Sequence, residues 1–97
     1  MSRYSRSAEL LERALKTIPL GAQTFSKSRT QFPLGVSPLF ADSAKGAELT
    51  DVDGNVFVDF INALAAVTIG YADPAINAAV VAQLERGVTF SLSTART

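Results

Sequence analysis

The sequence predicts an α/β segment in which a helix, a long loop, an antiparallel β-hairpin and a second helix follow one another. Three observations predict this order. Apolar residues repeat at helical spacing near the N-terminus, an Asp-Gly pair separates two strand-like runs, and a helical run with signals at both ends lies near the C-terminus. With 97 residues, 47% of them hydrophobic and 19% charged, the chain has the composition of at most one globular domain.

A helix is expected over residues 7–16. Its apolar residues recur three and four positions apart, which is the spacing of one helix face: Leu10, Leu11, Ala14, Leu15 and Ile18. Ser7 is expected to cap the first free amides, and Pro19 and Gly21 are expected to end the helix.

A loop is expected over residues 20–38, where Gly and Pro recur and no hydrophobic period holds. Loops of this length are uncommon inside compact domains and are usually functional or disordered. Apolar residues such as Phe25 and Phe32 are too frequent for a solvated linker. We therefore expect the loop to lie against another part of the protein.

Two strands joined by a tight turn are expected over residues 47–51 and 56–61, after a short strand over 39–41. The pair Asp53-Gly54 favours such a turn, because Gly adopts a positive φ without steric cost. The sequence therefore predicts an antiparallel hairpin.

The acidic residues of this turn also look like the start of a calcium-binding loop. An EF-hand that began at Asp51 would need Gly at its sixth position and Glu at its twelfth. Those positions hold Val56 and Asn62. The spacing therefore favours the hairpin, and no metal site is expected.

A second helix is expected over residues 73–87, with Asp73 as its N-cap, Pro74 at its first position and Gly87 at its end. Its buried face is expected to contain Ile76, Ala79, Val80 and Leu84. The run 63–69 before it is apolar on every side, so it needs cover on every side.

Composition excludes several classes of function. Nine basic and nine acidic residues cancel, so the chain has no electrostatic footprint for a nucleic acid or an anionic membrane. Without cysteine or histidine it has no disulfide, no thiolate zinc site and no histidine base. The first residues lack the apolar core of a signal peptide, so a cytoplasmic location is expected.

Hydrogen-bond donors gather in the long loop between Gln23 and Arg29. The guanidinium of Arg29 is a planar fork that matches a carboxylate, so anion or carboxylate recognition is one interpretation. A solvated loop with a stray charge is the other. Of the lysines, only Lys27 could act as a Schiff-base lysine, and a surface role is favoured for it. The residues alone therefore make no complete catalytic constellation.

An ordered series of short motifs resembles the N-terminal part of class III aminotransferases, and within that family the glutamate-1-semialdehyde aminomutase branch. The match runs from about Leu10 to Phe90 and includes Ile18-Pro19-Leu20-Gly21, Pro38-Leu39-Phe40, Lys45-Gly46-Ala47, Asp51-Val52-Asp53-Gly54-Asn55, Asp59-Phe60 and Ile69-Gly70-Tyr71-Ala72-Asp73-Pro74. Each piece is weak alone, but the series in this order is specific.

The resemblance implies the fold type I of pyridoxal-phosphate transferases. Residues 1–97 would then be an N-terminal segment that contributes a helix and an antiparallel sheet to the small domain, while the large cofactor-binding domain is absent from it. It implies a homodimer with pyridoxal 5'-phosphate as cofactor. The family's Schiff-base lysine and phosphate-binding turn lie beyond Thr97, so no catalytic residue is carried over and the cofactor contacts stay unassigned.

Two residues are carried over from the resemblance. Ser26 and Arg29 fall where the aminomutase branch has a Ser and an Arg that hold the substrate carboxylate. Two departures stand beside them. Leu20 replaces a customary glycine, and Leu64-Ala65-Ala66 replaces Trp-Gly-Pro, whose aromatic ring lines the substrate pocket in that branch. An aminotransferase with another substrate is therefore favoured over the aminomutase reaction.

Two hypotheses follow. In the first, the chain is part of an enzyme that transfers an amino group between an amino-acid donor and a carbonyl substrate, such as a sugar or a semialdehyde. The 97-residue segment alone is then expected to be inactive. In the second, the chain is a stand-alone binding module that uses its apolar loop and tail.

Overall fold

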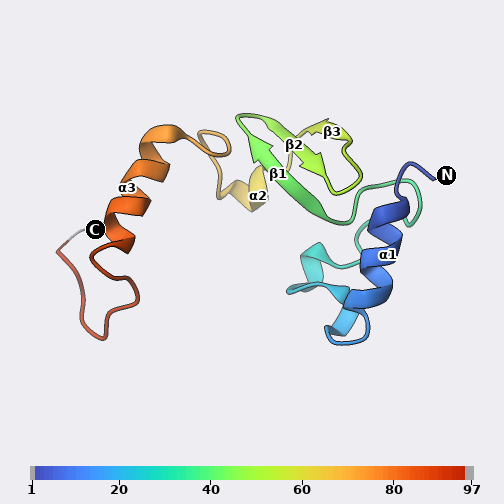
Figure 1. Ribbon diagram of the computed structural model, residues 1–97, viewed down its shortest axis with the longest axis horizontal. Helices are drawn as coiled ribbons and strands as arrows, with labels where there is room; N and C mark the ends of the chain where they lie inside the picture. The colour runs from blue at the N-terminus through green and yellow to red at the C-terminus, as the bar shows by residue number, and fades with distance from the viewer. Residues whose placement is uncertain (1, 96–97) are drawn as a thin grey trace.

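The computed structural model describes residues 2–95, which form an open arch measuring 50 × 29 × 21 Å. Helix α1 stands at one end of the arch, helix α3 at the other, and a small sheet lies between them (Figure 1). The elements are, in chain order, α1 (Ser5–Ala14), η1 (Pro19–Gly21), η2 (Phe25–Lys27), β1 (Ala41–Lys45), β2 (Glu48–Asp51), β3 (Val56–Val58), α2 (Asn62–Ala65) and α3 (Pro74–Leu84).

The sheet has three antiparallel strands in the order β1-β2-β3. The predicted hairpin is confirmed: β2 and β3 pair with Leu49 opposite Phe57, and Gly54 in their turn has φ +83°. The carboxylate of Asp51 holds this turn from inside. It is 1% exposed and accepts the amides of Asp53 and Asn55 at 3.0 and 2.7 Å.

The outer limits of the sheet differ from the sequence prediction. The strand expected over 39–41 begins only at Ala41, because β1 follows its pairing with β2 and not a hydrophobic pattern of its own. The strand expected over 56–61 ends at Val58, because the carboxylate of Asp59 accepts the amides of Ile61 and Asn62 and turns the chain away.

Helix α1 begins at Ser5, two residues earlier than expected, and the expected Ser7 cap is wrong. A carboxylate from the hairpin turn caps the helix instead. Asp53 accepts the amide of Arg6 at 2.7 Å and that of Ser7 at 3.0 Å. Ser7 is thereby drawn into the contact and is 1% exposed.

Arg3 and Tyr4 reinforce the contact between α1 and the hairpin. Arg3 donates through Nε to the side chain of Asn55 at 2.9 Å, and its guanidinium lies 5.5 Å from the centre of the Phe57 ring. Tyr4 is the buried hydrophobic residue of the described chain, 8% exposed. The seam between α1 and the hairpin therefore contains the buried side chains of Tyr4 and Ser7.

Helix α3 begins as predicted. Asp73 Oδ1 accepts the amides of Ala75 and Ile76, each at 3.0 Å, and Pro74 holds the first position. The predicted burial of one face is wrong for the described residues. Ile76, Val80 and Leu84 are 49–56% exposed, because α3 stands away from the sheet (Figure 1) and no element of residues 2–95 covers it.

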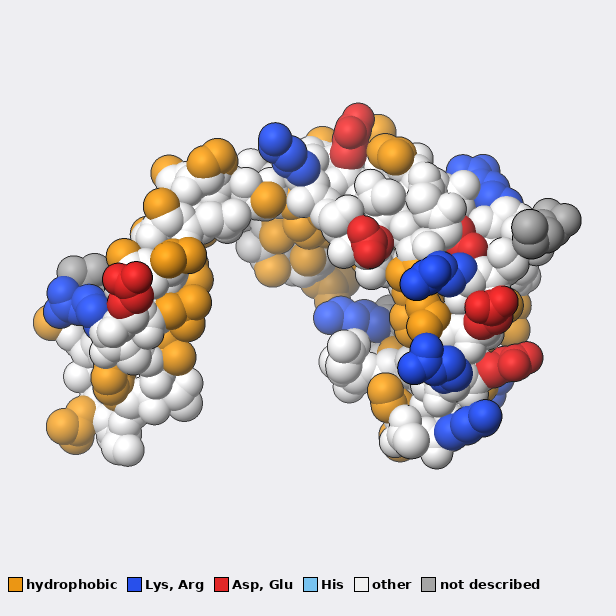
Figure 2. Space-filling model, viewed as in Figure 1, with side chains coloured by type: hydrophobic (Ala, Val, Ile, Leu, Met, Phe, Trp, Pro, Cys, Tyr) orange, Lys and Arg blue, Asp and Glu red, His pale blue; other side chains and the backbone are white. Residues whose placement is uncertain are grey.

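The apolar run 63–69 is also uncovered, with Leu64 74% and Ile69 64% exposed. Hydrophobic side chains gather along α3 and beneath the middle of the arch (Figure 2). Within residues 2–95, no helix is long and apolar enough to span a lipid bilayer.

We predict that Asp53→Ala frays the start of α1. The pKa of Asp53 is affected first by desolvation, which raises it, but the amides of Arg6 and Ser7 outweigh this and bring it below its ordinary value of 3.8. The ionised carboxylate therefore stabilises the helix above pH 3.8, and this contribution is lost as the pH falls through the lower folded pKa.

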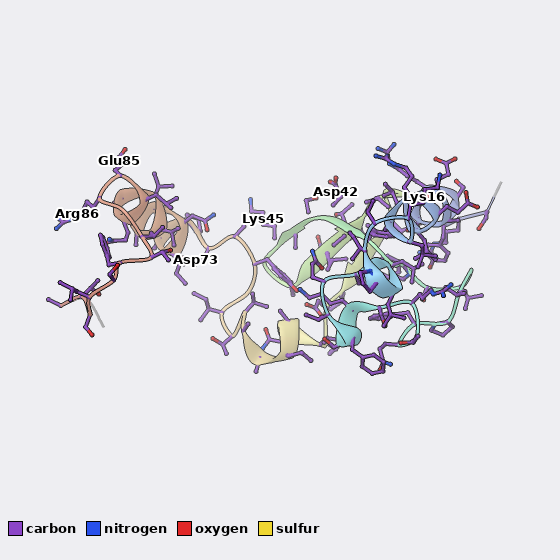
Figure 3. The ribbon with its side chains drawn as sticks, turned by 90° about the horizontal axis from the view of Figure 1, so that it is seen from below. Lys16, Asp42, Lys45, Asp73, Glu85 and Arg86 are labelled. Carbon is purple, nitrogen blue, oxygen red and sulfur yellow. The ribbon has the colours of Figure 1, made fainter. Side chains whose placement is uncertain are left out.

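Hydrogen exchange at the amides of Arg6 and Ser7 measures the effect. Asp42→Ala is the matched control, because Asp42 is an exposed aspartate of β1 (Figure 3) whose side chain makes no hydrogen bond or ion pair with residues 2–95. Equal exchange in the two variants at neutral pH would show that Asp53 does not hold the helix.

Candidate functional site

The two residues predicted to bind a carboxylate lie close together in sequence on an exposed loop. Ser26 is the middle residue of η2, and Arg29 follows two residues after η2 ends. Both side chains are exposed. The Ser26 hydroxyl lies 3.2 Å from the hydroxyl of Thr24, while Arg29 has no hydrogen bond or ion pair with any of residues 2–95. Its guanidinium is therefore available to a ligand.

Ser28 anchors this loop and was not singled out from the sequence. It is fully buried, its hydroxyl lies 2.6 Å from that of Thr30, and its amide donates to the carbonyl of Phe25 at 3.0 Å. Its carbonyl accepts the amide of Gln31 at 3.0 Å. With Ser28 turned inward, its neighbour Arg29 stays outside.

A second feature is the turn α2, whose backbone has the left-handed helical conformation. Asn62, Ala63, Leu64 and Ala65 have φ values of 58°, 47°, 56° and 70°. Asn tolerates this region, but an Ala or Leu there costs roughly 1–2 kcal/mol per residue. Such strained residues persist only where the surroundings determine them, and they cluster at functional sites.

The sequence analysis did not predict this turn, because the apolar run 63–69 has neither Gly nor Pro. The one local signal is Asn62, the residue type best suited to open a left-handed stretch. The preference of the other three residues is for other conformations, so contacts from elsewhere in the chain must hold α2.

Asp59 and Tyr71 supply those contacts. Asp59 Oδ1 accepts the amide of Ile61 at 2.7 Å and that of Asn62 at 3.2 Å, just where the turn begins. Asp59 Oδ2 accepts the hydroxyl of Tyr71 at 2.6 Å. The Asp59 carboxylate therefore connects the start of α2 to Tyr71, which lies 12 positions after Asp59 in the chain.

This pair shifts the titration of both groups. The hydrogen bond from Tyr71, followed by that from the Ile61 amide, holds the pKa of Asp59 below its ordinary value of 3.8. The same bond raises the pKa of Tyr71 above 10.0, because loss of the phenolic proton would set two negative charges together. The bonded form, with a neutral phenol and an ionised carboxylate, therefore persists across the neutral range.

Tyr71 is itself fixed to the sheet. Its amide and carbonyl exchange hydrogen bonds of 2.8 and 2.9 Å with Gly46, in the turn between β1 and β2. Gly70 makes this approach possible, since a Cβ there would lie 2.9 Å from the Gly46 carbonyl oxygen. The sheet, Tyr71, Asp59 and α2 thus form one connected unit.

The loop η2 and the turn α2 lie on the same side of the sheet in both ribbon views (Figures 1 and 3). Exposed hydrophobic side chains collect beneath the sheet on this side (Figure 2). The arrangement combines free donors on one segment with apolar side chains on another, which is the combination that small-molecule sites use.

The described residues do not form a pyridoxal phosphate site by themselves. Lys16, Lys27 and Lys45 are all exposed, and Lys16 and Lys45 lie on the side of the ribbon away from α2 (Figure 3). A hollow of about 500 Å³ lies between the end of α3 and the tail, and no lysine is among its lining residues, Gln83, Arg86, Val88, Thr89, Phe90, Thr94 and Ala95. Residues 2–95 also hold no cluster of acidic residues suited to a metal ion.

Comparisons with known proteins place the chain in context. A model of the family described as Aminotransferase class-III matches residues 32–96. The glutamate-1-semialdehyde 2,1-aminomutase of Desulfosudis oleivorans is 39% identical over 90 residues, which cover 93% of this chain and 21% of that protein. The chain therefore spans about a fifth of the length of such relatives.

Two solved structures share the fold over nearly the whole chain. An omega-transaminase from Sphaerobacter thermophilus is 38% identical with a TM-score of 0.78, over 93% of this chain and 19% of its own. A glutamate-1-semialdehyde aminomutase from Pseudomonas aeruginosa PAO1, in complex with PMP, is 34% identical with a TM-score of 0.80. The match covers 94% of this chain and 19% of that one.

We predict that Gly70→Ala destabilises the protein where residue 70 lies against the Gly46 backbone. The new Cβ would meet the Gly46 backbone, and overpacking of this kind typically costs about 1–3 kcal/mol. Gly35→Ala is the control, because Gly35 also has a positive φ but open space around it. Chemical unfolding of the protein should show the larger loss for Gly70→Ala, whereas equal losses would mean that only φ matters.

Proposed function

Because the chain belongs to the class III aminotransferase family, we propose that it is the N-terminal segment of a longer enzyme that depends on pyridoxal phosphate. This enzyme transfers an amino group between an amino-acid donor and a carbonyl substrate. The observation that carries the proposal is the family match over residues 32–96, joined with a shared fold over 93% and 94% of the chain. The aminomutase reaction is the alternative within the family.

The uncovered apolar surface supports the proposal that further protein belongs here. Burial of a Val, Leu or Ile side chain typically contributes about 1.5–3 kcal/mol. Helix α3 and the run 63–69 leave many such side chains exposed. We expect these side chains to be covered by a large domain and by the second subunit of a homodimer. Residues 1–97 would then contribute to the small domain, and the enzyme would act in the cytoplasm.

The same proposal assigns the cofactor. Pyridoxal phosphate is the cofactor of the family and supplies the electron sink for amino transfer. The exposed lysines of residues 2–95 do not make its site, so its Schiff-base lysine and phosphate contacts belong to the rest of the enzyme.

Within this segment we assign Ser26 and Arg29 to the substrate carboxylate. The free, exposed guanidinium of Arg29 supports this, because a carboxylate can take both of its parallel N–H groups. The loop that carries Arg29 is anchored by Ser28, which is buried and lies within hydrogen-bond distance of the Thr30 hydroxyl.

The turn α2 supports a substrate other than glutamate-1-semialdehyde. Leu64-Ala65-Ala66 lie where the resemblance implies Trp-Gly-Pro, and Leu64 is 74% exposed in the described chain. An aliphatic side chain cannot stack or donate a hydrogen bond as an indole ring can. The proposed enzyme is therefore an aminotransferase for another amino donor.

We predict that Arg29→Ala in the complete enzyme lowers kcat/KM for carboxylate-bearing donors by roughly ten- to a hundredfold. The estimate follows from a hydrogen bond to a charged group, typically worth about 1.5–3 kcal/mol. Cofactor loading should stay unchanged. Arg29→Lys should recover only part of the loss, because an ammonium lacks the planar fork.

Arg13→Ala is the control for this experiment, because Arg13 is an exposed arginine that belongs to α1 and not to the loop. If Arg29→Ala and Arg13→Ala both treat carboxylate-bearing donors as the unsubstituted enzyme does, Arg29 is an ordinary surface residue.

We also predict that the 97-residue segment alone is inactive and forms no stable aldimine with added pyridoxal phosphate, because its lysines are exposed and lack a phosphate cradle. Absorbance and borohydride trapping measure this. A stoichiometric adduct on Lys27 would contradict the assignment and would favour a stand-alone module.

A further inference from the structure

We propose that Asp59 and Tyr71 are positioning residues for substrate specificity: their hydrogen bond holds the left-handed turn α2 so that Leu64 keeps one place at the substrate. The inference rests on the proposed function and deepens it. Neither residue needs to touch the substrate, since each acts through the turn.

The conformation of α2 needs contacts from outside the turn to hold it. Three of its four residues are Ala or Leu with φ between 47° and 70°, a region these residues avoid. Within the turn, the Leu64 amide donates to the Ile61 carbonyl at 3.2 Å and the Val67 amide to the Asn62 carbonyl at 3.4 Å. These long bonds alone are a weak reason for such a conformation.

Asp59 acts at the entrance of the turn. Its Oδ1 accepts the two amides that lead into α2, at 2.7 and 3.2 Å, which fixes the direction in which the chain enters. Bonds to an ionised acceptor are stronger than neutral ones. The short 2.6 Å bond from Tyr71 fixes the carboxylate itself.

Tyr71 connects Asp59 to the sheet. Its backbone amide and carbonyl both bond to Gly46, so the Tyr71 backbone is held next to the β1–β2 turn. Without the Tyr71 hydroxyl, Asp59 would keep its hydrogen bonds to Ile61 and Asn62 but lose the hydrogen bond that connects it to the sheet.

The turn α2 can affect specificity through Leu64. Leu64 projects from α2 and is 74% exposed, while the loop with Ser26 and Arg29 lies on the same side of the sheet (Figures 1 and 3). A donor whose carboxylate is held by that loop places its side chain towards one wall of the site. The position of an aliphatic wall decides how large that side chain can be.

The decisive variant is Tyr71→Phe in the complete enzyme, because it removes one hydroxyl and keeps the ring. Tyr4→Phe is the matched control, as Tyr4 is the only other tyrosine of the sequence and lies at the α1 seam. Hydrogen exchange is measured at the amides of Ile61 and Asn62, and kcat/KM is measured for L-alanine and L-leucine as small and larger donors.

We expect Tyr71→Phe to accelerate exchange at the two amides by roughly tenfold or more, the factor that a hydrogen bond to a charged group typically represents in an equilibrium constant. The ratio of kcat/KM between the two donors should shift by a similar factor, with cofactor loading unchanged. Asp59→Asn should give an intermediate effect, because the amide oxygen still accepts hydrogen bonds without the charge.

Unchanged exchange in Tyr71→Phe overturns the proposal, and so does faster exchange with an unchanged donor ratio. A matching change in Tyr4→Phe also overturns it, since the effect would then be general loosening. If the unsubstituted enzyme loaded with pyridoxal phosphate transfers no amino group from any donor, the proposed function fails. The exchange measurement still reports on the hold of Asp59 and Tyr71 over α2.

Discussion

Aspartate carboxylates accept backbone amides at four of the places where this chain changes direction. Asp51 holds the hairpin turn, Asp53 the start of α1, Asp59 the entrance to α2 and Asp73 the start of α3. Amides at helix starts and tight turns have no partner in their own element, and an ionised carboxylate is the strongest acceptor a side chain offers. These four contacts therefore fix the hairpin turn, the entrance to α2 and the starts of α1 and α3.

This dependence on polar contacts reflects how little apolar surface residues 2–95 bury. Their most buried side chains are those of Ser7, Ser28 and Asp51, and Tyr4 is the buried hydrophobic among them. Apolar packing normally supplies most of the stability of a domain. Here the large hydrophobic side chains of α3 and of the run 63–69 remain outside, which fits a segment that completes its packing against other protein.

Hydrogen bonds of polar side chains hold both parts of the candidate site. Arg29 stays outside because Ser28 is turned inward by local hydrogen bonds, and Leu64 projects because Asp59 and Tyr71 hold α2 in a left-handed turn. The strain in α2 is concentrated at apolar residues that carry no polar function of their own. Their conformation is therefore set by the contacts of Asp59 and Tyr71 and not by the backbone preferences of Ala and Leu.

The sequence by itself determined the features whose causes lie within a few residues. Asp53-Gly54 specifies the hairpin turn and Asp73-Pro74 the start of α3, because the donor and acceptor are at most four positions apart. The family motifs and the spacing of Ser26 and Arg29 are equally local.

Only the tertiary structure decided the cap of α1, the left-handed turn and the burial of each face. Asp53 reaches Arg6 and Ser7 across 47 and 46 residues, so a capping rule applied to neighbouring residues selects Ser7 wrongly. The turn α2 contradicts the preferences of its own Ala and Leu residues and exists because Asp59, Tyr71 and the sheet constrain it. The apolar face of α3 is visible in the sequence, but whether it is buried depends on what packs against it, and that is a property of the assembled protein.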